Sequence, residues 1–147
     1  METTDTSLTI NRVFPITIED MWDLWTNPAR ISQWHRPNMT DFSTQSSVDA
    51  VVGGKYRIEM TEGGETHTAM GEFKEIDKPH KLSYSWQWEN DPSNEVSEVT
   101  VSLVSVPEGT KLTLVHARLS GPQSVKDHGE GWLGCLENIN VLLKGGL

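Results

Sequence analysis

Residues 124–144 read SVKDHGEGWLGCLENINVLLK, and this stretch decides the fold. Its apolar residues recur at the spacing of one face of an α-helix. They are Val125, Trp132, Leu136, Ile139 and Leu143. Ser124 with Asp127 three positions later indicates a capped helix start, and Lys144-Gly145 indicates the end. A long helix with one apolar face must pack that face against another element, which the rest of the chain has to supply.

Three glycines lie in the first half of this predicted helix, at Gly129, Gly131 and Gly134. Each costs about 1 kcal/mol relative to alanine inside a helix. Two interpretations stay open. Either the helix backbone comes close to the sheet or to a ligand there, or the first turn is irregular and frayed.

The residues before this helix predict an antiparallel sheet of about seven strands. Alternating apolar and polar residues indicate the strands, and clusters rich in glycine, proline and asparagine indicate the turns. The expected strands are 7–14, 40–47, 55–60, 66–76, 82–89, 95–106 and 110–119. Two short helices follow the first strand, one starting at Thr17 and one running from Asn27-Pro28 to about Trp34. The expected fold class is α+β, in a single domain over residues 1–147.

Composition excludes several classes of function. The net charge of −9, from 21 acidic and 12 basic residues, disfavours nucleic acid and anionic lipid as partners. No signal sequence and no stretch of membrane length occurs, so we expect a cytoplasmic protein without membrane insertion. The single cysteine, Cys135, permits no intrachain disulfide and no cysteine cluster. Metal and cofactor motifs are missing, so neither a metal site nor a cofactor is expected.

Short motifs distributed along nearly the whole chain point to a family. They are Arg12-Val13-Phe14, Met21-Trp22, Gln33-Trp34, Val52-Gly53-Gly54-Lys55-Tyr56-Arg57, Gly71-Glu72-Phe73, Glu75-Ile76-Asp77-Lys78-Pro79 and His128-Gly129-Glu130-Gly131-Trp132. In this order they resemble the activator of Hsp90 ATPase homologue family, a branch of the START-like (SRPBCC) superfamily. The resemblance implies the helix-grip fold, in which a curved sheet and the C-terminal helix enclose a hydrophobic cavity. It also leaves open a chaperone or another protein as partner.

Aromatic residues alternate with polar ones in the strand 82–89, so the aromatic side chains share one face of the sheet. In a sheet curved around a helix, that face looks into the interior. Applying the same alternation to the other strands, and adding Trp132 and Leu136 from the apolar face of the helix, gives the candidate ligand-binding residues. They are Tyr56, Ile58, Met60, His67, Tyr84, Trp86, Trp88, Val99, Val101, Leu114, His116, Trp132 and Leu136. Whether they enclose an open cavity or fill a core stays open, whereas Trp22 and Trp25 are expected in the core.

No catalytic residue is assigned. His116 is either a neutral core histidine or a ligand contact and proton acceptor. His128 and Cys135 are seven positions apart on the helix, too far for a nucleophile and its base. Three functions remain, since the fold does not choose between them. The preferred hypothesis is binding of a hydrophobic small molecule, such as a lipid, polyketide or aromatic metabolite. The alternatives are a co-chaperone-like interaction domain, and a cyclase or hydrolase using His67 or His116 as base.

Overall fold

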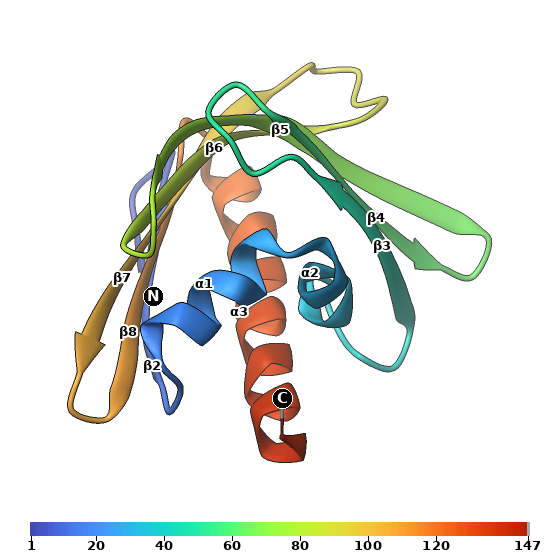
Figure 1. Ribbon diagram of the computed structural model, residues 1–147. Coiled ribbons are helices and arrows are strands. Elements are labelled where there is room, and N and C mark those ends of the chain that lie inside the picture. The colour runs from blue at the N-terminus through green and yellow to red at the C-terminus, as the bar shows by residue number, and fades with distance from the viewer. Residues whose placement is uncertain (147) are drawn as a thin grey trace.

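Eight antiparallel strands form one curved sheet that wraps around the C-terminal helix (Figure 1). The computed structural model describes residues 1–146. The strands are β1 (Glu2–Thr3), β2 (Leu8–Phe14), β3 (Phe42–Val48), β4 (Lys55–Glu62), β5 (Glu65–Asp77), β6 (Lys81–Trp88), β7 (Val96–Val106) and β8 (Gly109–Ala117). The helices are α1 (Ile18–Thr26), α2 (Pro28–Trp34) and α3 (Pro122–Gly145). This is the α+β helix-grip arrangement predicted from the sequence.

The order of strands in the sheet is β1-β2-β8-β7-β6-β5-β4-β3. The last strand therefore lies beside β2, and α1 and α2 carry the chain across to β3 at the opposite edge (Figure 1). Both short helices occupy the mouth of the curved sheet beside α3. No helix within residues 1–146 is long and apolar enough to cross a membrane.

The two short helices begin where the sequence predicts. The Thr17 side chain accepts a hydrogen bond from the Asp20 backbone N–H at 3.2 Å, which caps α1. Asn27 ends α1 and also caps α2, accepting from the Ala29 N–H at 3.0 Å. Pro28 follows as the first helical residue, where its missing N–H has no cost.

The predicted strand ends are correct to within two residues, but one additional strand and the start of the last helix differ from the prediction. The strand β1 was not expected, because two polar residues that pair with Leu8 and Thr9 show no alternation to detect. Helix α3 begins at Pro122 after Gly121, so Ser124 is not its cap but lies in the first turn. The Ser124 hydroxyl does not cap the helix. It contacts the Glu95 carboxylate in the loop before β7 and the His128 ring one turn later on α3.

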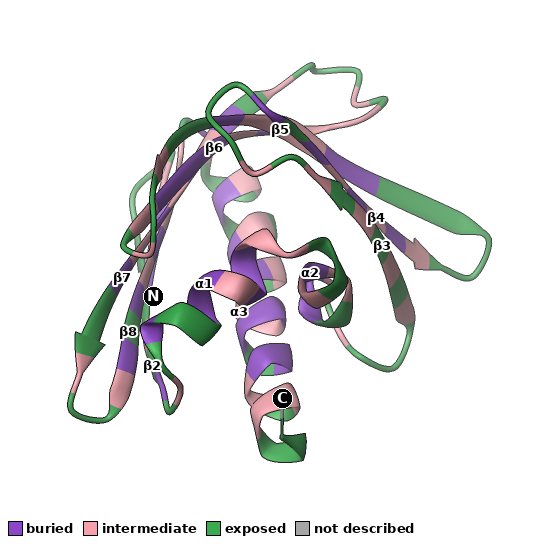
Figure 2. Cartoon of the chain, viewed as in Figure 1, coloured by how far each residue is buried: buried purple, intermediate pink, exposed green. Residues whose placement is uncertain are grey.

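The core lies between the concave face of the sheet and the three helices (Figure 2). The inward alternation predicted for the strands is confirmed, because alternate residues along β4, β7 and β8 are buried. They are Tyr56, Ile58 and Met60 on β4, Val99, Val101 and Leu103 on β7, and Leu112, Leu114 and His116 on β8. Trp22 and Trp25 are also buried, as expected.

Helix α3 is held closely against the segment after α2. The Asn138 side-chain amide donates to the Trp34 carbonyl at 3.0 Å and to the Arg36 carbonyl at 2.8 Å. One turn earlier, a Cβ at Gly134 would overlap the carbonyl oxygen of Pro37. The helix is continuous through all three glycines, so the frayed alternative is wrong. At Gly134 the close approach is to the turn after α2, whereas at Gly129 an added Cβ would meet Met1 and, at 3.7 Å, Leu8 of β2.

We expect Gly134→Ala to lower the free energy of unfolding by about 1–3 kcal/mol, because backbone on one side has to move to admit the methyl group. The matched control is Gly131→Ala on the same helix, where no atom lies within 4 Å of the added Cβ. That change should raise the free energy of unfolding by about 0.5–1 kcal/mol through helix propensity. Urea denaturation measures both, and equal stabilities for the two variants would contradict the close approach.

Candidate functional site

The interior divides into a filled part and an open part. Tyr56 and Ile58 on β4 and Tyr84 on β6 line a void of only about 20 Å³ under α1 and α2. Two residues further along each strand, Met60 and Trp86 line a cleft of about 590 Å³. A step of two residues along a strand is about 6.6 Å, so the change is abrupt. Each of the alternatives left open by the sequence therefore describes one part of the interior.

Helix α3 supplies one wall of the cleft, strands β4, β5 and β6 supply another, and the turn after α2 closes the inner end. The lining residues are His35, Pro37, Met60, His67, Trp86, Trp88, Asp127, His128, Gly131, Trp132 and Cys135. The α3 residues recur at helical spacing on one face, with Gly131 leaving open space where a side chain would project.

The thirteen candidate residues fall into three groups. Those that line the cleft are Met60, His67, Trp86, Trp88 and Trp132. Those beside the small void are Tyr56, Ile58 and Tyr84. Those packed in the core, lining neither, are Val99, Val101, Leu114, His116 and Leu136. The third group lies on β7, β8 and α3. These side chains are buried and border neither the cleft nor the small void.

His67 has the predicted direction but not the predicted depth. It shares its face of β5 with Ala69, which is fully buried. The His67 side chain itself is 55% exposed, because the β4–β5 hairpin extends beyond the helices (Figure 1). It therefore lies at the rim of the cleft rather than inside it.

Six lining residues were missed by sequence reasoning. They are His35, Pro37, Asp127, His128, Gly131 and Cys135. The signal for the α3 members was their helical spacing around Trp132, which a search for apolar residues alone passes over. His35 and Pro37 follow α2 in an irregular turn, where no periodicity indicates which way a side chain points.

A hydrogen bond between Trp132 and His116 fixes the protonation of His116. The Trp132 indole N–H donates to Nδ1 of His116 at 2.9 Å. Because an indole can only donate, Nδ1 is unprotonated and Nε2 carries the proton. Nε2 then donates to the Ser97 hydroxyl at 2.7 Å. Burial, with a smaller effect of nearby His128, lowers the pKa of His116 to about 3, so the ring is neutral near pH 7.

The same pairing recurs nearer the rim with the opposite tautomer. The Trp88 indole N–H donates to Nε2 of His128 at 3.0 Å, which leaves Nδ1 to donate to the Ser124 carbonyl at 2.8 Å. The Ser124 hydroxyl lies 3.3 Å from both carboxylate oxygens of Glu95. The loop before β7 is thereby joined to the start of α3.

These contacts leave little acid–base chemistry in the cleft. Both ring nitrogens of His116 and of His128 already have partners, so neither ring is free to accept a proton from a ligand. Burial raises the pKa of the Cys135 thiol to about 12, and that thiol lies 3.4 Å from the Arg36 carbonyl, to which it donates. Within residues 1–146, no three acidic, histidine or cysteine side chains gather closely enough to hold a metal ion.

Two buried polar atoms beside the cleft are unpaired. The rings of His35 and Trp86 stack with centroids 5.7 Å apart. Nε2 of His35 and the Trp86 indole N–H have no hydrogen-bond partner among the described residues. Burial also lowers the pKa of His35 to about 4, so this ring is neutral as well. Buried polar groups nearly always have partners, and the Trp25 indole N–H beside the small void is a further exception, so unpaired atoms occur in both parts of the interior.

We expect the free energy of unfolding to fall as the pH is lowered from about 6.5 towards 4. In the unfolded chain a histidine binds its proton near pH 6.5, whereas folded His35 and His116 do so only near pH 4 and pH 3. The unfolded state therefore binds more protons in this window, which favours unfolding. Each histidine should reduce the stability at pH 5 by about 2 kcal/mol relative to pH 7.

Urea denaturation at pH 7 and pH 5 tests this expectation. His116→Gln can keep both hydrogen bonds but does not titrate, so it should lose about 2 kcal/mol of the pH dependence. His80→Gln is the matched control, because it makes the same exchange at an exposed position between β5 and β6. A His116→Gln protein with the full pH dependence would show that His116 is not held neutral.

Solved structures with the same fold come from several organisms. A protein of Rhodobacter sphaeroides is 21% identical, with a TM-score of 0.84, 100% of this chain covered and 98% of that one. The AHSA1 protein of Silicibacter pomeroyi is 22% identical, with a TM-score of 0.82 and coverage of 94% and 97%. An Hsp90 activator from Plasmodium falciparum is 28% identical, with a TM-score of 0.76 and coverage of 95% and 96%.

The sequence comparisons agree with the fold. No curated protein matches the chain significantly. The family model described as "Activator of Hsp90 ATPase homolog 1-like protein" matches residues 15–144, which include every element from α1 to nearly the end of α3. The chain therefore belongs to the activator of Hsp90 ATPase homolog 1-like family, as the motifs in the sequence predicted.

Proposed function

We propose that the chain binds a small, largely apolar molecule with aromatic character in the cleft between α3 and strands β4–β6. The observation that carries this proposal is a cleft of about 590 Å³ with three tryptophans in its wall. Ligand sites typically measure about 300–1,000 Å³ and are mainly apolar, with a few polar groups that orient the ligand.

The three indoles enclose space instead of forming one flat layer. Trp86 lies at 88° to Trp88, with centroids 5.4 Å apart, and at 52° to Trp132, with centroids 5.3 Å apart. A planar ligand can thus contact more than one ring. Met60 on β4 also lines the cleft, and its flexible side chain can adapt to ligands of different shapes.

The energetics of such a ligand are reasonable. The best small ligands gain at most about 0.3–1.5 kcal/mol per non-hydrogen atom, less for larger molecules. A molecule of about 15 such atoms reaches a micromolar dissociation constant if each contributes about 0.55 kcal/mol, which lies within this ceiling. The neutral, hydrogen-bonded histidines favour binding over acid–base catalysis, because they orient the indoles without offering a free base.

We expect Gly131→Leu to weaken binding of an apolar fluorescent probe, N-phenyl-naphthylamine, by at least about tenfold, because the leucine side chain projects into the cleft. Gly131→Ala fills much less space and should change the affinity by less than about threefold. Titration of probe fluorescence measures both variants after urea denaturation has shown that they are folded.

The matched control for the added leucine is Glu137→Leu, which places the same side chain on the exposed face of α3. This variant should bind the probe as the wild type does. Wild-type affinity in Gly131→Leu, or no binding of any apolar probe to the wild type, would contradict the proposed function.

A second candidate function is an interaction with Hsp90, favoured by the description of the family and by the Hsp90 activator of Plasmodium falciparum, which is 28% identical. A direct assay adds the chain to purified Hsp90 and measures ATP hydrolysis. Stimulation that Gly131→Leu leaves intact would assign this function to the protein surface instead of the cleft. No stimulation by the wild type would remove this candidate.

A further inference from the structure

Leaving histidine aside, the only charged group that lines the described part of the cleft is a carboxylate. None of the described lining residues is a lysine or an arginine, whereas Asp127 contributes a carboxylate at the rim. One Asp127 oxygen accepts from the Gln123 side-chain amide at 2.9 Å, and the described part of the chain contains no ion pair of this carboxylate. Glu95 adds a second carboxylate beside Ser124, one turn earlier on α3.

Two histidines beside the cleft are engaged by indoles. His116 and His128 each accept an indole N–H through one ring nitrogen. His35 at the inner end is neutral because it is fully enclosed by aromatic rings. The described lining therefore contains no lysine or arginine against which an anionic group could bind. Arg36, beside Cys135, donates instead to the backbone carbonyls of Ser32 and Phe42.

The orientation of two indoles reinforces this preference. The N–H edges of Trp88 and Trp132, the most positive part of each ring, are turned towards His128 and His116. What these rings can offer a ligand is then mainly their π faces, which carry negative electrostatic potential. A cation over a tryptophan face is attracted by this potential, and most strongly where water is excluded. The net charge of −9 adds attraction at longer range.

We propose that the cleft selects an organic cation, an aromatic or apolar molecule that carries a protonated or quaternary amine. This proposal rests on the proposed function, because it specifies the charge of the ligand that the cleft binds. The amine lies against the indole faces near the rim, within the field of Asp127, and the apolar body extends inward along Met60. Carboxylate ligands such as fatty acids are disfavoured, since their charge would meet Asp127 without a basic partner.

Three probes of similar shape test this selectivity. They are naphthylmethyl-trimethylammonium, its uncharged carbon isostere neopentylnaphthalene, and the anion naphthylacetate. Displacement of N-phenyl-naphthylamine at low salt gives each affinity. We expect the cation to bind about tenfold more tightly than the isostere, which is within the range of a desolvated cation–π contact. The anion should bind at least about tenfold more weakly than the isostere.

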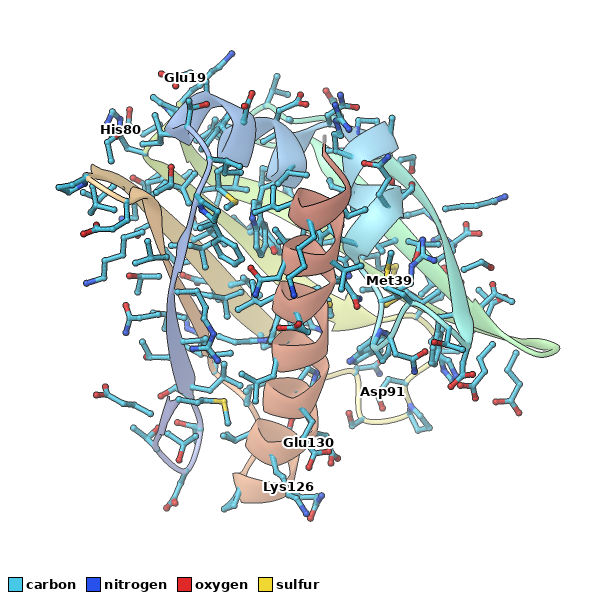
Figure 3. All side chains as sticks on the ribbon, turned by 90° about the horizontal axis from the view of Figure 1, so that it is seen from below. Glu19, Met39, His80, Asp91, Lys126 and Glu130 are labelled. Atoms are coloured by element: carbon cyan, nitrogen blue, oxygen red, sulfur yellow. The ribbon has the colours of Figure 1, made fainter. Side chains whose placement is uncertain are left out.

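Asp127→Asn tests the residue that carries the charge. It keeps the shape and a hydrogen-bonding oxygen, and it should lower affinity for the cation about threefold while leaving the neutral isostere unchanged. The matched control is Glu130→Gln on α3, since Glu130 is exposed and does not line the cleft (Figure 3). Both variants change the net charge equally, so only a local role of Asp127 separates them.

The outcomes distinguish this inference from the proposed function. Equal affinity for the cation and the isostere would overturn the selectivity and leave the binding function intact. Equal losses in Asp127→Asn and Glu130→Gln would overturn the role of Asp127, because long-range charge alone would then explain the preference. Failure of all three probes to bind would refute the proposed function, and the selectivity with it.

Discussion

The hydrogen bond from the Trp132 indole to His116 joins α3 to the sheet at the boundary between the filled part of the interior and the cleft. From His116 the hydrogen bonds continue through Ser97 to the carbonyl of Trp86, at 3.3 Å. One connected series thus runs from the helix across β8, β7 and β6, which are neighbours in the sheet. Because every polar atom in it has a partner, it can remain buried without an ion.

This series also explains why binding and catalysis are unequal candidates. An imidazole that orients an indole through one nitrogen and donates through the other is a structural group, and His128 with Trp88 repeats the arrangement. In a catalytic Ser-His-Asp triad the carboxylate accepts a hydrogen bond from the histidine ring. Here the Glu95 carboxylate contacts the Ser124 hydroxyl instead. The tryptophans are therefore positioned as rigid walls of the cleft.

Sequence reasoning predicted the fold and the inward faces of the strands, because a period of two is a direct consequence of strand geometry. It did not predict depth along a strand, which is why Ile58 and Met60 share a face but border different spaces. The position of His67 at the rim has the same origin. His35 and Pro37 could not be assigned, because a turn has no period and its side chains are directed by tertiary packing. The helix start was placed at Ser124 because that side chain fits a cap, but Gly121 and Pro122 start α3 through backbone geometry instead.

The divided interior has a consequence for how this architecture diversifies. Side chains beside the small void are enclosed on all sides, so exchanging them disturbs close packing and lowers the stability of the whole chain. Side chains lining the cleft contact empty space on one side, and their replacement removes fewer packing contacts. The fold indeed persists in a structure only 21% identical. Under the proposed binding function, substitutions in the cleft could change the ligand without rebuilding the core.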